Sequence, residues 1–141
     1  MIGVLVRSHY RLADEFVTAL RHIVGETPHV RAIGLDPAST APEEMRTQID
    51  KAIREVDQGT GVLVLVDMFG GTPSNLSLAF LDEGRVEVVT GVNLPMLVKV
   101  ARQKEGTGIH ELAELARDYG RRNISVASDL LGNREPDKSA S

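Results

Sequence analysis

The sequence has no cysteine and few aromatic residues, with three Phe and two Tyr among 141 positions. Without cysteine the chain can form neither disulfides nor thiolate metal sites, and its composition fits a reducing compartment. So few aromatic side chains offer no platform on which nucleotide bases could stack. These absences exclude a disulfide scaffold and disfavour a binder of single-stranded nucleic acid.

An excess of positive charge and a long hydrophobic run are also missing. The formal net charge is −4, and the lysines and arginines are spread along the chain rather than gathered in a stripe. We therefore expect no nucleic-acid partner. The apolar run at residues 1–6 ends at Arg7, too short for a signal peptide or a membrane span. The expected location is cytoplasmic.

What the chain has is enough apolar material for one core, since 42% of its residues are hydrophobic. Residues 1–130 are expected to form one domain. From residue 131 the composition changes to "LGNREPDKSAS", which has little to bury. This tail over residues 131–141 is expected to be disordered.

Short apolar runs alternate with segments of helical period. The runs "IGVLV", "HVRAIGL", "GVLVLV" and "VEVVT" predict buried strands at residues 2–6, 29–35, 61–66 and 86–90. Between them apolar residues recur at helical spacing, as at Leu12, Phe16 and Leu20. This order predicts an α/β fold, a flavodoxin-like doubly wound sheet with four parallel strands in the order 2-1-3-4. The run "NISVA" at 123–127 could add a short final strand.

In such a sheet, ligands bind beyond the carboxyl ends of the strands, at the switch point between strands one and three. His9 follows the first strand and Asp67 follows the third. The predicted topology therefore places these two side chains opposite each other. A carboxylate that accepts a hydrogen bond from one imidazole nitrogen fixes the tautomer and leaves the other nitrogen nucleophilic.

The residues after Asp67 predict an anion site. Gly70 and Gly71 allow close backbone approach, and a helix starting at Thr72 would offer free N–H groups and a positive dipole end. Ser8 could add a further donor. A nucleophilic histidine beside an anion site indicates phosphoryl transfer on His9. No metal or cofactor is predicted, because the histidines lack metal-ligand spacing and the turn lacks the lysine of a nucleotide-binding loop.

Three segments together resemble a known family. They are "IGVLVRSHYRLADEF" (2–16), "GVLVLVDMFGGTPSN" (61–75) and "VVTGVNLPMLVKV" (88–100). They are similar to the IIA component of the mannose family of the bacterial phosphoenolpyruvate-dependent sugar phosphotransferase system, over about residues 1–128.

The resemblance implies a phosphocarrier. The histidine at the position of His9 would accept a phosphoryl group from the phosphocarrier protein HPr and pass it to a IIB component. Asp67 matches the family's supporting aspartate, and Thr72 matches its hydroxyl residue. The resemblance also implies a homodimer and an antiparallel last strand, for which "NISVA" would serve. Contact with a membrane would be indirect, through transporter components.

Two residues depart from the family pattern. Tyr10 stands where the family often has glycine, and Phe69 stands where some relatives have tryptophan. Both could change how a partner docks. Met68, Phe69, Leu94 and Met96 are candidate docking contacts, with ordinary packing as the alternative interpretation.

Other functions remain open. The phosphotransfer subunit of dihydroxyacetone kinase resembles this domain and also uses the histidine. A regulatory binding module, whose affinity for a target changes with the phosphorylation of His9, is another alternative. A receiver-like domain phosphorylated on Asp67 is disfavoured, because "RSHY" supplies no acidic pair for Mg²⁺.

Overall fold

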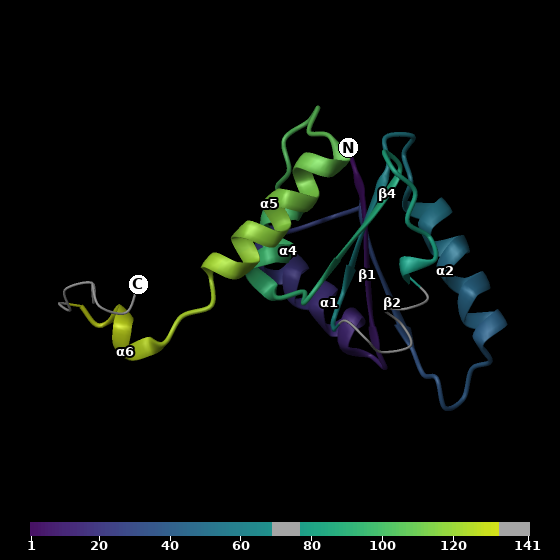
Figure 1. Cartoon of the computed structure of the whole chain (residues 1–141). Coiled ribbons are helices and arrows are strands. Elements are labelled where there is room, and N and C mark those ends of the chain that lie inside the picture. Colours follow the sequence, from purple (N-terminus) through teal and green to yellow (C-terminus); the bar gives the residue numbers. More distant parts are fainter. Residues whose placement is uncertain (69–76, 133–141) are drawn as a thin grey trace.

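The structure is a computed structural model that describes residues 1–68 and 77–132. Strands and helices alternate along most of the chain (Figure 1). The elements are β1 (Gly3–His9), α1 (Leu12–Val24), β2 (Val30–Leu35), α2 (Pro42–Val56), β3 (Val62–Val66), β4 (Val86–Thr90), α4 (Leu94–Ala101), α5 (Ile109–Arg122) and α6 (Ala127–Leu130).

The four strands form one parallel sheet in the order β2-β1-β3-β4, which confirms the predicted fold class. The central strand β1 pairs with β2 on one side and with β3 on the other. Helices α1, α4 and α5 cover one face of the sheet, and α2 covers the other (Figure 1).

Burial on both faces explains why the strands are apolar at nearly every position. In β1, Val4 and Val6 belong to the core under α1, α4 and α5, whereas Leu5 belongs to the core under α2. In β3, Leu63 and Leu65 face the first core. Because side chains alternate between the two faces of a strand, a sheet covered on both sides requires apolar residues in succession.

Strand β1 is longer than its apolar run predicts. Arg7, Ser8 and His9 continue the pairing with β2, in which His9 lies opposite Leu35. The backbone forms hydrogen bonds whatever the side chain, so polar residues extend the strand beyond the apolar run. His9 is therefore the last residue of a central strand rather than a loop residue.

The predicted final strand at 123–127 is wrong for this chain. Residues 123–126 belong to no strand, and Ala127–Leu130 forms the short helix α6. A strand needs a neighbouring backbone to pair with, and this segment leads away from the sheet after α5 (Figure 1). Its apolar side chains Ile124 and Val126 are exposed.

The predicted helix start at Thr72 lies outside the described residues, and so do most of the predicted tail residues. Among the helices of residues 1–68 and 77–132, none combines the length and the hydropathy needed to cross a membrane.

Candidate active site

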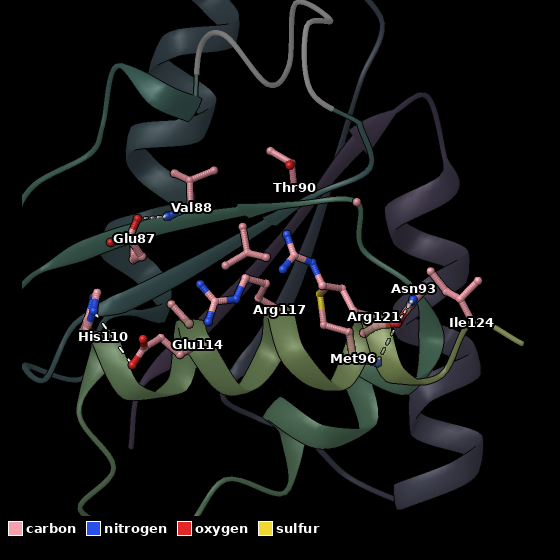
Figure 2. A pocket seen from close by; sticks show the side chains of 14 residues that line it. Glu87, Val88, Thr90, Asn93, Met96, His110, Glu114, Arg117, Arg121 and Ile124 are labelled. Carbon is pink, nitrogen blue, oxygen red and sulfur yellow. Dashed lines mark hydrogen bonds and ion pairs between the residues drawn. The ribbon is translucent and has the colours of Figure 1, made fainter. Parts of the chain in front are cut away.

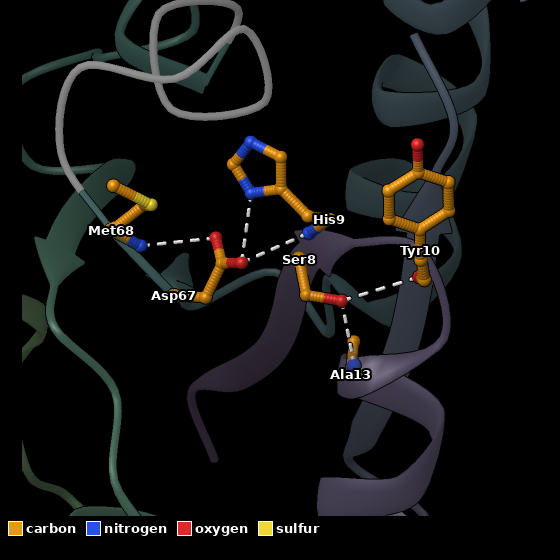
Figure 3. A network of polar contacts seen from close by, with 6 residues as sticks. All are labelled: Ser8, His9, Tyr10, Ala13, Asp67 and Met68. Carbon is orange, nitrogen blue, oxygen red and sulfur yellow. Dashed lines mark hydrogen bonds and ion pairs between the residues drawn. The ribbon is translucent and has the colours of Figure 1, made fainter. Parts of the chain in front are cut away.

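The sheet register brings His9 and Asp67 together from positions 58 residues apart. Arg7 in β1 lies opposite Val66 in β3, so the next residues of both strands meet at the carboxyl edge of the sheet. The backbone N–H of His9 donates a hydrogen bond to Asp67 Oδ2 at 3.0 Å. The His9 ring nitrogen Nδ1 lies 2.9 Å from the same oxygen (Figure 3).

This contact defines which ring nitrogen is available. An ionised carboxylate only accepts hydrogen bonds, so Nδ1 carries the proton that it donates to Asp67. The other nitrogen, Nε2, then holds a free electron pair and points away from Asp67 (Figure 3). The His9 side chain is partly exposed while Asp67 is nearly buried. The pair therefore presents a nucleophilic nitrogen to solvent from an oriented ring.

Asp67 is held in its ionised form. Burial acts to raise the pKa of Asp67, but hydrogen bonds from the His9 backbone, the His9 ring and the Met68 backbone act together to lower it. The result is a pKa below the ordinary value for an aspartate. The Met68 N–H donates to Asp67 Oδ1 at 3.0 Å, so both carboxylate oxygens have a donor. The carboxylate can therefore offset positive charge on the imidazole.

Ser8 occupies a different place from the one predicted. Its side chain is fully buried, and its hydroxyl oxygen accepts a hydrogen bond from the Ala13 N–H at 2.6 Å (Figure 3). The hydroxyl also lies 3.4 Å from the Tyr10 carbonyl oxygen. It thereby satisfies one of the free N–H groups at the start of α1. The Ser8 hydroxyl therefore binds at the start of α1, and its contact with an anion stays a prediction.

The other predicted phosphate ligands, Gly70, Gly71 and Thr72, lie outside the described residues, and so does Phe69. Their roles stay predictions.

Tyr10, directly after His9, has an unusual backbone. Its φ is +52°, the left-handed region that side chains other than glycine rarely adopt. Its N–H donates to the Leu35 carbonyl at 2.8 Å, and its own carbonyl packs so closely on Gly34 that a Cβ there would clash. The Tyr10 side chain is exposed beside the site. A strained residue next to the nucleophile is typical of functional sites.

The candidate docking residues separate into two groups. Met68 is exposed next to Asp67 and is available to a partner. Met96 is buried in the core, and Leu94 packs against the same core, so ordinary packing explains both.

Arg7 adjoins this site, since its carbonyl accepts a hydrogen bond from the Asp67 N–H, and no sequence motif indicated it. It is fully buried in β1, and its guanidinium donates a hydrogen bond to the Ser77 hydroxyl. Burial lowers the pKa of Arg7 to about 10, and the charge of Asp67 partly opposes this shift. The signal was a charged residue inside an otherwise apolar strand, immediately before the residues that carry the chemistry.

A groove of about 440 Å³ lies elsewhere, between the outer strand β4 and helix α5 (Figure 2). Arg117, Arg121 and Glu114 reach into it from α5. Neither His9 nor Asp67 lines this groove. The histidine–aspartate pair therefore lies outside this groove.

Comparison with protein families gives a match over residues 3–117 to the model of the EIIA-man family, described as PTS system fructose IIA component. The chain belongs to this family. The family comprises IIA components of the phosphotransferase system (PTS). The resemblance stated from the sequence is thereby confirmed.

Individual relatives agree with this assignment. The chain is 30% identical over 127 residues to the PTS system mannose-specific EIIAB component of Escherichia coli (strain K12), covering 89% of this chain and 39% of that protein. It thus spans about two fifths of the length of that relative. It is also 31% identical over 138 residues to the transcriptional regulatory protein LevR of Bacillus subtilis (strain 168), covering 96% of this chain and 14% of LevR.

A solved structure shares the fold. The phosphotransferase system component EIIA from Streptococcus agalactiae has a TM-score of 0.80 and 26% sequence identity. The match covers 92% of this chain and 99% of that one. The four-stranded parallel sheet with its order 2-1-3-4 therefore matches that of known IIA proteins.

Proposed function

We propose that the chain is a phosphocarrier that accepts a phosphoryl group on His9 Nε2 from phosphorylated HPr and passes it to a IIB component. One observation carries the proposal: Nδ1 of His9 lies 2.9 Å from Asp67 Oδ2, which orients the ring and leaves Nε2 free. Both HPr as donor and a IIB component as acceptor follow from the family's chemistry. The protein would act in the cytoplasm and meet the membrane only through those components.

The transfer needs no water and no redox partner. The electron pair of Nε2 attacks phosphorus in line, and the Nε2–P bond forms as the donor's N–P bond breaks. The breaking bond returns its electron pair to the donor nitrogen. The proton on Nδ1 stays between the ring and Asp67, so the carboxylate offsets the positive charge that develops on the imidazole. Transfer to the acceptor reverses these steps.

The glycine turn completes the proposed site. Backbone N–H groups of Gly70, Gly71 and Thr72, with the Thr72 hydroxyl, would hold the phosphoryl oxygens. The proposal draws support from the position of Asp67, which is close to these residues in sequence and contacts His9.

We propose further that the chain is a homodimer. Two features support this idea. Strand β4 lies at the edge of the sheet, where one side of its backbone has no neighbouring strand among the described residues. The segment after α5 exposes apolar side chains, Ile124, Val126, Leu130 and Leu131. Sedimentation at several protein concentrations would test the proposal, and a single monomeric species at all of them would contradict it.

The phosphocarrier proposal is tested by intact mass. The protein is incubated with phosphoenolpyruvate, HPr and the first enzyme of the system, and we expect a gain of one phosphoryl group, about 80 Da, that is acid-labile. His9→Ala should show no gain, whereas His110→Ala, which alters an exposed histidine on α5, should match the parent. An unmodified parent, or a modified His9→Ala, would overturn the proposal.

A regulatory role is the second candidate, and the match to LevR favours it, because that protein is a transcriptional regulator. In this role phosphorylation of His9 would change affinity for a target by adding negative charge at the sheet edge. Adding a IIB component that can accept phosphate separates the two roles. Transfer of the phosphoryl group from this protein to IIB supports the carrier role, and a phosphoryl group that stays on this protein supports the regulatory role.

A further inference from the structure

Arg7 is an unusual residue for its position. Among the residues that the structure describes, it is the one lysine or arginine that is buried, and it lies in the central strand of the sheet. Burying a guanidinium is costly, and apolar residues in its place are often equally stable or more stable. Stability alone therefore gives little reason for an arginine here.

Arg7 lies two residues before the proposed phosphorylated histidine in the same strand. Alternation along β1 puts Arg7 and His9 on the same face of the sheet, one pleat repeat of about 6.6 Å apart. The Arg7 carbonyl accepts a hydrogen bond at 3.2 Å from the N–H of Asp67, the residue that orients His9. The guanidinium is held in place by the Ser77 hydroxyl, which is also buried.

The positive charge of Arg7 is complementary to the negative charges that a phosphorylated site would hold. A phosphoryl group on His9 brings close to two negative charges to an edge where Asp67 is already ionised. Like charges close together disfavour each other, and a nearby fixed cation would offset this repulsion. The charge of Asp67 already acts favourably on that of Arg7.

We propose that Arg7 is a positioning residue for phosphoryl transfer, whose buried charge near His9 offsets the negative charge of the phosphoryl group and thereby sets how strongly the protein holds it. This inference rests on the proposed function of His9. It assigns to Arg7 a role in the equilibrium between donor and acceptor rather than contact with the reacting atoms.

The expected effect of the Arg7 charge on the phosphoryl-exchange equilibrium follows from Coulomb's law. If the guanidinium and the phosphoryl group are taken as roughly 10 Å apart in an effective dielectric constant of about 20, one unit of charge changes an equilibrium constant about tenfold or somewhat more. Because Arg7 is buried, added salt should screen this effect far less than it screens a surface charge.

The test measures the exchange equilibrium between phosphorylated HPr and this protein, for the parent, Arg7→Met, Arg7→Lys and Arg11→Met. Arg7→Met removes the charge but keeps an unbranched side chain, and we expect the equilibrium to shift about tenfold toward phosphorylated HPr, at low and high salt alike. Arg7→Lys keeps the charge and should remain within about threefold of the parent. Arg11→Met removes an exposed arginine near the same site and should have little effect.

A second readout needs no phosphorylation. The ¹³C signal of the Asp67 carboxylate is followed against pH, and its pKa should rise in Arg7→Met and stay near the parent value in Arg7→Lys. The charge of His9 acts on Asp67, and the charge of Asp67 acts on Arg7. Ser77→Ala, which keeps the cation but removes the hydrogen bond from Arg7 to the Ser77 hydroxyl, should move both readouts less than Arg7→Met does. If Arg7→Met does not fold, Arg7→Gln serves as the neutral variant.

The outcomes separate the two proposals. If the parent is phosphorylated on His9 and the folded neutral variant shows the same exchange equilibrium and the same Asp67 titration, this inference is wrong and the proposed function stands. If the neutral variant only lowers the melting temperature, Arg7 is a structural residue. If the parent takes up no phosphoryl group, the proposed function fails and this inference fails with it.

Discussion

Two histidine–carboxylate pairs lie in the described part of the molecule, and they differ in almost every physical respect. His9 and Asp67 are 2.9 Å apart, with side chains 31% and 10% exposed; His9 ends β1, and Asp67 directly follows the adjacent strand β3. His110 and Glu114 are 3.9 Å apart on one helix, with side chains 80% and 51% exposed. An imidazole and a carboxylate are therefore paired once at short distance with little exposure, and once at longer distance with both side chains in solvent.

The difference shows what makes a histidine useful. In the exposed pair both side chains can rotate, and water and salt compete for them. In the other pair the backbone N–H of His9 also binds Asp67, and the Met68 N–H binds the second oxygen. The carboxylate is fixed from two sides, so it fixes the ring in turn. Orientation of the ring, more than proximity to a carboxylate, distinguishes His9.

The largest predicted effect comes from removing each histidine in turn. His9→Ala should abolish phosphorylation by phosphorylated HPr, because it removes the nucleophile. His110→Ala should leave the rate unchanged, because its pair with Glu114 is exposed and lies on α5. The measurement is the initial rate of phosphoryl uptake. Loss of uptake in His110→Ala would contradict the distinction between His9 and His110.

Removal of each carboxylate charge should give the next largest effect. Asp67→Asn retains the shape but loses the charge and allows the wrong ring tautomer, and we expect the uptake rate to fall roughly 10²-fold or more. Glu114→Gln is the matched variant and should stay within about twofold of the parent. Equal rates for Asp67→Asn and the parent would show that the carboxylate does not orient a reacting ring.

Lowering the pH should weaken the His9–Asp67 pair. The pKa of Asp67 lies below its ordinary value of 3.8, so the folded state favours the ionised form. That stabilisation is complete at neutral pH and is lost as the pH falls from about 3.8 through the lower folded value. In urea unfolding, the free energy of unfolding of the parent should therefore fall toward that of Asp67→Asn over this range. A difference that is constant with pH would contradict the assignment.

The smallest predicted effect concerns Tyr10. This residue is a strained neighbour of the His9–Asp67 pair, and the His110–Glu114 pair on α5 has no such neighbour. Tyr10→Gly relieves the positive φ and should stabilise the fold by about 0.5–1 kcal/mol, whereas Tyr10→Ala keeps the strain and should not. If the exposed ring contacts the donor, both variants should raise KM for phosphorylated HPr about threefold with kcat unchanged. Identical KM values would remove Tyr10 from partner docking.

Much of the fold and the central pair could be predicted from the sequence, because both depend on regular patterns. Apolar runs alternating with helical periodicity determine a parallel sheet, and the order of that sheet brings His9 to Asp67. The features that the sequence does not reveal depend on side-chain direction. Nothing in "RSH" shows that Ser8 turns toward the start of α1 while Arg7 lies buried under the other face.

The predicted last strand was wrong for a related reason. "NISVA" has the residues of a strand, since Ile124 and Val126 alternate with smaller or polar neighbours. Strand propensity describes fit to a sheet and does not supply one. After α5 the chain leads away from β4, so this segment has no strand beside it in the single chain (Figure 1).

The central claim is that Asp67 holds His9 through Nδ1 so that Nε2 carries the phosphoryl group. Long-range ¹H–¹⁵N NMR of the phosphorylated protein, labelled in its histidine rings, tests this claim most directly. We expect phosphorus coupling on Nε2 of His9 and a proton on Nδ1. Phosphorus on Nδ1, or on a residue other than His9, would contradict it.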